Sequence, residues 1–273
     1  MKKIIFLFLM MLMMLTPQLS GAASTKTSKL DRQSWSWTGA LGKYDKASAQ
    51  RGLQIYTQVC AGCHSLNLLP FRTLEKIGYS KDEIKAFART YQIEEVADDG
   101  KVIRRSGLPS DYFPEPFATE ADARLANGGS YPPDLSLVVK SYSLGRGNLF
   151  LNFVDALLIQ GDASGADFIY GILTGYENPP SNVVMNENMY FNKYAGQISM
   201  PPPLVDGIVS YSDGTKNDVK QMSYDVVTFL AFAAEPNLEE SRYMALKFFM
   251  VLFVIYYLVY RVKKKKWREL DDY

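Results

Sequence analysis

The chain has 273 residues, with 30 Lys and Arg, 29 Asp and Glu, one His and two Cys, which gives a formal net charge of +1. This length allows one or two domains, and a hydrophobic content of 47% is typical of a globular protein rather than a disordered or polytopic membrane chain. Two cysteines exclude a disulfide-dense secreted scaffold, and a single histidine excludes metal sites that need two or three imidazoles.

Residues 1–23 have the pattern of a secretory signal peptide. Lys2 and Lys3 precede an apolar run from Ile4 to Leu15, and small residues follow at 20–23. The apolar run is too short to span a bilayer comfortably, which favours cleavage after residue 22 or 23 over retention as an N-terminal anchor. We therefore expect the chain from residue 24 onward to be exported.

A helix is predicted over residues 47–59, and it leads into Cys60-Ala61-Gly62-Cys63-His64, which contains both cysteines and the only histidine. Cys-x-x-Cys-His is the attachment pattern of a c-type haem. At helical spacing the three residues share a face, so two sulfurs can bond to one porphyrin edge while the imidazole lies under the iron. The motif predicts one covalently bound haem c, with Cys60 and Cys63 as the thioether cysteines and His64 as the proximal iron ligand.

Two other interpretations of the motif are weaker. A thioredoxin-like dithiol needs Cys-x-x-Cys at the start of a helix, which lowers the pKa of a thiol, whereas here the motif comes late in a helical pattern. A zinc site needs a fourth ligand, and the chain has no second Cys or His pair to supply it.

The middle of the chain has few strong patterns. Residues 80–122 are polar and rich in acids, and they indicate either a solvated insertion or an acidic face that docks a basic partner. No segment has a strong strand pattern. Thr119-Glu120-Ala121-Asp122 resembles a capping box and predicts a short helix carrying Arg124, which Gly128-Gly129 would end before a tight loop over 129–134 near the haem.

Apolar residues at helical spacing predict three further core helices. Their inward residues are Leu149, Phe150, Phe153, Ala156 and Leu157; then Phe168, Ile169, Ile172 and Leu173; and then Val226, Phe229, Leu230 and Ala233. The last of these helices is predicted over 225–234, with Pro236 ending it. Packing of this kind around a haem excludes water from it.

A second axial ligand of the iron cannot be another histidine in this chain. Four methionines lie outside the predicted signal peptide and anchor: Met185, Met189, Met200 and Met222. Met200 differs from the others because three prolines follow it, and they hold the chain extended and stiff. A stiff segment loses less entropy when its sulfur binds iron. The residues alone favour Met200 and leave the other three open.

Residues 244–261 predict a transmembrane anchor. The run is apolar or aromatic as far as Tyr260 except for Lys247, and it spans about 25 Å as a helix. Basic residues at 261 and 263–266 follow at once, which is typical of the cytoplasmic side and argues against a buried core helix. The remaining domains are then an exported domain over 24–243 and a cytoplasmic tail over 262–273.

The exported domain is acidic, although the whole chain is nearly neutral. Residues 24–243 contain 21 Lys and Arg against 26 Asp and Glu, a net charge of −5. Such a domain does not suit nucleic acid, and it would attract a cationic protein partner.

Several blocks of the sequence resemble the cytochrome c1 family, the membrane-anchored haem subunits of cytochrome bc1 complexes. In chain order these are RGLQIYTQVCAGCHS at 51–65, Phe71-Arg72, ARLANGGSYPPDLS at 123–136, LTGY at 173–176, ISMPPPL at 198–204, and Glu235-Pro236 with Arg242 before the anchor. The approach to the methionine loop departs from the family, with a polar stretch over 176–194, so the path of this loop is not predicted.

The resemblance implies the rest of the assignment. The fold would be mainly α, a cytochrome c-like haem domain with loop insertions plus one C-terminal transmembrane helix. Met200 would be the sixth iron ligand, and Arg124 would contact a haem propionate. The chain would be an electron carrier rather than an enzyme, taking electrons from the Rieske iron–sulfur protein and passing them to cytochrome c in a respiratory complex with cytochrome b. Its haem domain would lie in the periplasm of a bacterial inner membrane.

Three rival functions remain at this point. An anchored c-type cytochrome of another respiratory complex would share the haem motif but not the block at 123–136. A haem peroxidase would need a five-coordinate iron, and a thiol oxidoreductase would contain no haem.

Overall fold

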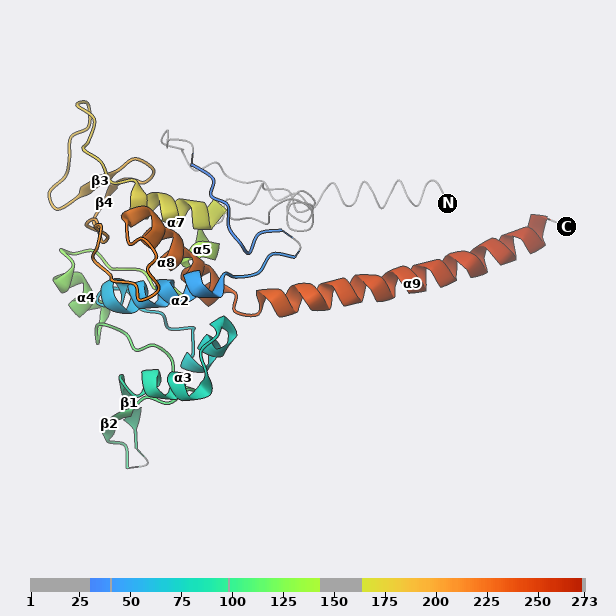
Figure 1. The fold of residues 1–273 in the computed structure, drawn as a ribbon, viewed down its shortest axis with the longest axis horizontal. Coiled ribbons are helices and arrows are strands. Elements are labelled where there is room, and N and C mark those ends of the chain that lie inside the picture. The colour runs from blue at the N-terminus through green and yellow to red at the C-terminus, as the bar shows by residue number, and fades with distance from the viewer. Residues whose placement is uncertain (1–29, 40, 98, 143–163, 272–273) are drawn as a thin grey trace.

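The computed structural model describes residues 30–39, 41–97, 99–142 and 164–271. In this part of the chain the fold is mainly α, as predicted, with one domain and a long helix that extends away from it (Figure 1). The predicted signal peptide at 1–23 and the predicted stripe at 149–157 lie outside the described residues.

The described elements follow one another along the chain with few strands among them. They are α2 (Lys46–Ile55), η1 (Tyr56–Cys60), η2 (Phe71–Ile77), α3 (Lys81–Ala88), β1 (Gln92–Val96), β2 (Val102–Ser106), α4 (Glu120–Ala126), α5 (Val138–Ser141), α7 (Ser164–Thr174), β3 (Tyr190–Asn192), β4 (Gly196–Ile198), α8 (Val219–Ala234) and α9 (Leu238–Asp271).

Helices α2 and α8 form the centre of the domain. They approach closely because Gly52 of α2 faces α8, where an added Cβ would lie 2.1 Å from the carbonyl oxygen of Asp225. Each helix begins at an aspartate, Asp45 or Asp218, whose side chain accepts hydrogen bonds from amides of the first turn. The close contact fixes the direction in which α2 leads into the cysteine motif.

Helix α8 is buried on most of its surface. Its predicted inward residues are all buried: Val226, Phe229, Leu230 and Ala233. The helix ends before Pro236, as predicted, but it begins at Val219 rather than at 225, since the Asp218 cap opens it earlier. Helices α5 and α7 pack on α8, and Ile169 of the predicted stripe in α7 is buried.

The N-terminal segment packs against α7 and α8 through Trp35. Trp35 stacks on Tyr224 of α8 with ring centroids 4.8 Å apart, and its indole donates a hydrogen bond to Asp167 of α7. Trp37 and Tyr44 continue the aromatic contact towards the end of α8. Residues far apart in the sequence are thereby joined around one hydrophobic core.

A lobe of the domain contains η2, α3 and the hairpin of β1 and β2, and α3 and the hairpin lie at the bottom of the domain in Figure 1. Its buried residues continue the same hydrophobic core. Its centre is an aromatic cluster of Phe71, Phe87, Tyr91 and Phe113. The capping box at Ser80 and Glu83 starts α3.

The described residues contain two short antiparallel hairpins, β1–β2 and β3–β4, although no strands were expected from the residue pattern. The first hairpin pairs Val96 with Val102 across a turn that contains Asp99-Gly100. An Asp-Gly pair between β-branched residues is a hairpin signal, but the charged residues around this one are typical of a solvated insertion.

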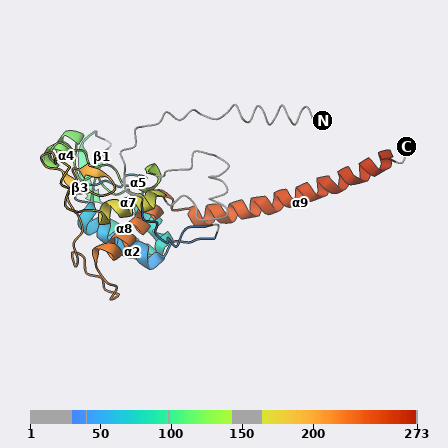
Figure 2. The ribbon, with the colours of Figure 1, turned by 90° about the horizontal axis from the view of Figure 1, so that it is seen from above.

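Helix α9 runs from Leu238 to Asp271 and points away from the domain in both views (Figures 1 and 2). It starts before the predicted position 244 and continues through the basic residues at 263–266 without a break. Within the described chain it is the one helix long and apolar enough to cross a membrane, and none of its apolar stretch is buried.

The base of α9 is held firmly against the domain. Arg242 donates hydrogen bonds to the carbonyl oxygens of Trp37 and Gly42, at 2.7 and 2.8 Å. Lys76 of η2 forms an ion pair with Glu240 at 2.8 Å. These contacts fix the direction of the helix relative to the domain.

Candidate functional site

The cysteine motif follows directly from α2, but through a wider turn than we predicted. Instead of a regular helix to residue 59, residues 56–60 form a π-turn in which the Ala61 amide donates to the Tyr56 carbonyl at 2.8 Å. The His64 amide then donates to the Cys60 carbonyl at 2.9 Å, so the motif is wound as one helical turn. This winding keeps the two sulfurs and the imidazole within a single helical turn, as thioether attachment requires.

Both cysteines are free thiols in this structure, and their surroundings differ. Cys63 is exposed, whereas Cys60 is half-buried against the core. Burial, together with the neighbouring Cys63, raises the pKa of Cys60 to about 12. A thiol with such a pKa is a poor nucleophile at neutral pH, which is the opposite of what a dithiol oxidoreductase needs.

The imidazole of His64 is oriented by a backbone carbonyl. Its Nδ1 lies 2.8 Å from the carbonyl oxygen of Pro133. A carbonyl oxygen only accepts, so Nδ1 donates the proton and Nε2 keeps its lone pair for a metal. Burial lowers the pKa of His64, although the Pro133 hydrogen bond opposes the effect, so the neutral imidazole is favoured. This is how a histidine ligand is normally prepared for iron.

The loop over residues 129–136, which we call the proline loop, is tied to the cysteine motif by several further bonds. The Leu135 amide donates to the Ser65 carbonyl at 2.9 Å. One carboxylate oxygen of Asp134 accepts from the Ser65 hydroxyl and from the Asn67 amide, each at 2.9 Å. Pro133 is therefore held in place by its neighbours in the loop.

The same proline loop also reaches the segment that contains Met200. Ser130 donates a hydrogen bond from its hydroxyl to that of Ser199, the residue before Met200, at 2.7 Å. Met200 follows shortly after β4, whose hairpin with β3 positions it. Both predicted ligand segments, at His64 and at Met200, therefore contact one short loop.

Arg124 lies on α4, the predicted short helix, which begins at the Thr119 cap. Its guanidinium forms an ion pair with Glu120 at 2.6 Å, donates to the Gly129 carbonyl at 3.1 Å, and lies over the ring of Tyr131. The side chain is 48% exposed. The arginine therefore sits beside the proline loop while engaged with residues of its own helix and that loop.

The donor set fits a covalently attached haem. Two free thiols and one oriented imidazole lie on one turn, and a methionine segment is fastened to the same loop as the imidazole. Among the residues that the structure describes, no three or more His, Cys, Asp or Glu side chains lie together so as to hold a metal ion.

Several acids of the acid-rich segment at 80–122 form ion pairs with bases of the same segment. Glu94 pairs with Arg104 across the hairpin, Arg105 pairs with Glu95, and Arg105 also pairs with Asp111 at 2.5 Å. The hairpin register places Glu94 directly opposite Arg104, whereas Arg105 reaches Glu95 diagonally and Asp111 beyond the end of β2. The segment still has more acids than bases, so both alternatives drawn from the sequence stay open.

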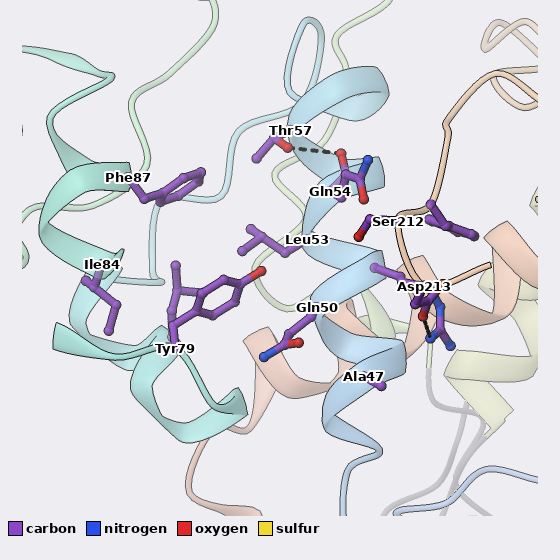
Figure 3. A pocket seen from close by; sticks show the side chains of 13 residues that line it. Ala47, Gln50, Leu53, Gln54, Thr57, Tyr79, Ile84, Phe87, Ser212 and Asp213 are labelled. Carbon is purple, nitrogen blue, oxygen red and sulfur yellow. Dashed lines mark hydrogen bonds and ion pairs between the residues drawn. The ribbon is translucent and has the colours of Figure 1, made fainter. Parts of the chain in front are cut away.

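A separate cleft of about 370 Å³ lies between α2, the lobe containing α3 and the segment 211–213 (Figure 3). Gln50 and Gln54 of α2 and Thr57 of η1 line it on one side, and Tyr79 and Phe87 face them. None of the cysteine motif or the methionine segment contributes to its lining. The cleft is therefore distinct from the candidate site.

The sequence predicts Cys60, Cys63, His64 and Met200 as site residues and the resemblance adds Arg124, but neither indicates the residues that contact them. Pro133 and Ser130 lie in the block at 123–136 that resembles the cytochrome c1 family, but the resemblance assigns no role to either residue. Their contacts cross 69 positions of the chain, and no spacing rule predicts such a distance.

Comparison with known proteins supports the resemblance seen in the sequence. The model of the Cytochrome C1 family matches residues 35–270. The cytochrome b/c1 of Bradyrhizobium diazoefficiens is 41% identical over 90% of this chain, which spans 37% of that longer protein. The mitochondrial cytochrome c1-2 heme protein of Solanum tuberosum is 39% identical over 87% of this chain and 85% of its own length. The cytochrome c1 of Rhodospirillum rubrum is 37% identical over 92% of this chain and 93% of its own length. A match of this extent, together with the arrangement of the cysteine motif, shows that the chain belongs to the cytochrome c1 family.

Proposed function

We propose that the chain is a membrane-anchored c-type cytochrome that carries single electrons within a bc1 complex. The observation that carries the proposal is the joint attachment of two ligand segments to the proline loop: His64 through Pro133 and the Met200 segment through Ser130. A haem bound there supplies an iron that gains and loses one electron. Everything else in the site holds that iron in a fixed environment.

Each residue has one task in this proposal. Cys60 and Cys63 would hold a single haem c through thioether bonds, in which each thiol adds across a vinyl group, sulfur to one carbon and hydrogen to the other. His64 offers Nε2 to the iron because its Nδ1 proton is committed to Pro133. Met200 would supply a sulfur ligand, which would favour ferrous iron and raise the potential. Arg124, fixed beside the proline loop, neutralises a haem propionate.

With both His64 and Met200 holding the iron, the haem would have no open position for oxygen or peroxide. The chain therefore transfers electrons without chemistry of its own, and the oxidoreductase activity belongs to the complex. One electron enters from the reduced Rieske iron–sulfur protein and one leaves to oxidised cytochrome c. Cytochrome b is the membrane partner beside α9. No nucleic acid takes part.

The domain boundaries follow from the same proposal. Residues 1–23 are removed on export, residues 24–243 form the periplasmic haem domain, residues 244–261 cross the bacterial inner membrane, and residues 262–273 stay in the cytoplasm. The support is the length and exposure of α9 and the basic residues near its end. The contacts of Arg242 and Lys76 hold the domain in one orientation above the bilayer.

The experiment that tests the proposal is a purification of the tagged full chain from its native membrane in mild detergent. We expect cytochrome b and an iron–sulfur protein to co-purify, and we expect the reduced preparation to transfer electrons to cytochrome c without binding carbon monoxide. Rapid binding of carbon monoxide by the native reduced protein would contradict the closed iron. Co-purification with an oxidase instead of cytochrome b would place the chain in another respiratory complex.

A further inference from the structure

Tyr176 lies between the end of α7 and the segment that contains Met200. It forms an isolated antiparallel bridge with Asn192 of β3, and its hydroxyl donates a hydrogen bond to the Met200 carbonyl at 3.0 Å. The same hydroxyl lies 3.3 Å from the Pro201 carbonyl. One side chain thus contacts two consecutive carbonyls at the predicted ligand.

The backbone of this segment needs an outside donor. Strand β4 ends at Ile198, and the three prolines at 201–203 have no N–H groups with which to extend the hairpin. The carbonyls of Met200 and Pro201 lie beyond the last pair of the β3–β4 ladder, Tyr190 with Ile198. The single hydrogen of the Tyr176 hydroxyl is donated to the Met200 carbonyl, with the Pro201 carbonyl as the more distant second acceptor.

A second hydroxyl holds the segment from the proline loop. Ser199 accepts a hydrogen bond from Ser130 at 2.7 Å, and its own hydroxyl donates to the sulfur of Met189 at 3.3 Å. The segment 199–201 is thus hydrogen-bonded at two points. Ser199 bonds to the proline loop, and the carbonyls of Met200 and Pro201 face the Tyr176 hydroxyl. Stiffness from the prolines fixes their shape, and these two contacts fix their position.

We propose that Tyr176 is a positioning residue for Met200, and that it acts together with Ser130 as a two-point latch on the methionine segment. The inference rests on the proposed role of Met200 as an iron ligand. The latch holds the Met200 sulfur at the iron by making any outward movement of the segment break a hydrogen bond at each point.

The latch determines how easily an external ligand displaces Met200. An incoming imidazole binds only the fraction of molecules in which the segment has moved away, so its apparent affinity scales with that fraction. Loss of one neutral hydrogen bond changes such an equilibrium by about two- to tenfold. The variant Tyr176→Phe should therefore bind imidazole about two- to tenfold more tightly than the parent protein.

The experiment compares three single variants of the purified full chain by optical titration of the ferric protein with imidazole. Tyr176→Phe and Ser130→Ala each remove one hydroxyl of the latch. Tyr224→Phe is the matched control, because its hydroxyl donates to the Ser34 carbonyl at 3.1 Å, on the N-terminal segment and away from Met200. The sulfur-to-iron absorption band in the red region and the midpoint potential are recorded for each variant.

We expect Tyr176→Phe and Ser130→Ala to tighten imidazole binding, weaken the sulfur–iron band and lower the potential, while Tyr224→Phe matches the parent. Values for Tyr176→Phe and Ser130→Ala that equal those of Tyr224→Phe would overturn the latch. If Tyr176→Phe does not fold, Ser130→Ala alone decides.

Failure of the latch can be told apart from failure of the proposed function by the variant Met200→Leu. If that variant keeps the sulfur–iron band, Met200 is not the ligand and the proposed site is wrong. If the band is lost in Met200→Leu and unchanged in both latch variants, the site stands and the latch is wrong.

Discussion

The Nδ1 atom of His64 donates a hydrogen bond to the carbonyl oxygen of Pro133, which lies 69 positions later in the chain. The bond leaves Nε2 as the free nitrogen and keeps the ring from rotating. Because the acceptor belongs to the backbone, the orientation of His64 depends on the proline loop as a whole rather than on one replaceable side chain.

Asp134 should be the side chain that holds this loop in place. Its carboxylate accepts from Ser65 and Asn67 through one oxygen and from the Ser136 amide, at 2.8 Å, through the other. We expect Asp134→Ala to lower the free energy of unfolding by roughly 3 kcal/mol, since it leaves three donors without an acceptor. Guanidinium unfolding of the full chain in detergent, followed by haem absorbance, measures the change. An unchanged midpoint would show that the loop is held by other contacts.

Replacement of Met200 should separate haem attachment from haem potential. Met200→Leu leaves the cysteine motif intact, so haem should stay bound while the midpoint potential falls substantially, because the sulfur that favours ferrous iron is gone. An optical redox titration measures this. Met222→Leu is the matched control, since Met222 is fully buried in α8 and takes no part in the site. A drop in potential for Met222→Leu rather than for Met200→Leu would reverse the assignment.

The ion pairs of Arg51 allow a clean comparison of buried and exposed charges. Arg51 pairs with Asp225, whose side chain is fully buried, and with Asp213, whose side chain is 43% exposed, each at 2.8 Å. Asp225→Ala leaves a cation partly buried without its main partner and should cost about 3–5 kcal/mol of unfolding free energy. Asp213→Ala should cost less than about 1 kcal/mol. Equal losses in the two variants, measured by the same unfolding assay, would contradict the burial difference.

The hairpin lobe should lose part of its stability in acid. The hydrogen bond from Arg105 lowers the pKa of Asp111 below its usual value. A carboxylate with a lowered pKa stabilises the folded state above the unfolded pKa, which is about 4, and that contribution disappears as the pH falls through the lower folded value. Asp111→Asn should therefore be less stable than the parent at neutral pH, and the difference should shrink below about pH 4.

The measurement for Asp111 is the free energy of unfolding of both proteins between neutral pH and about pH 3. Glu83 is not a suitable comparison, since its pKa is lowered by the Ser80 capping bonds of α3. A difference between parent and Asp111→Asn that grows towards acid would contradict a lowered pKa for Asp111 in the folded protein.

The parts of the molecule that local chemistry determines could be predicted from the sequence. The haem motif and helix α8 depend on spacing or periodicity within a few turns, so the residues alone predict them, whereas the stiffness after Met200 only favours it over three other methionines. The hairpin of β1 and β2 was also encoded locally, by Asp99-Gly100, but its charges concealed it. The Asp99-Gly100 pair predicts this hairpin when turn residues are weighed before charge.

The contacts that orient the ligands could not be predicted in the same way. Pro133 meets His64, Ser130 meets Ser199, and Tyr176 meets Met200 only after α2, α7 and α8 have packed. Proline, serine and tyrosine are common in loops, so none of these residue types signals a bond to a partner so far along the chain. The π-turn at 56–60 is another example, because it adjusts the cysteine motif to the core beneath it.

Covalent attachment of one porphyrin to Cys60 and Cys63 is the claim on which every other assignment depends, and extraction with acidified acetone tests it directly. The purified chain is unfolded, extracted and separated on a denaturing gel that is stained for haem. We predict that the colour stays with the protein band, and that replacing both cysteines by alanine releases it into the solvent. Colour that leaves the unchanged chain during extraction would contradict covalent attachment and, with it, the identity of the site.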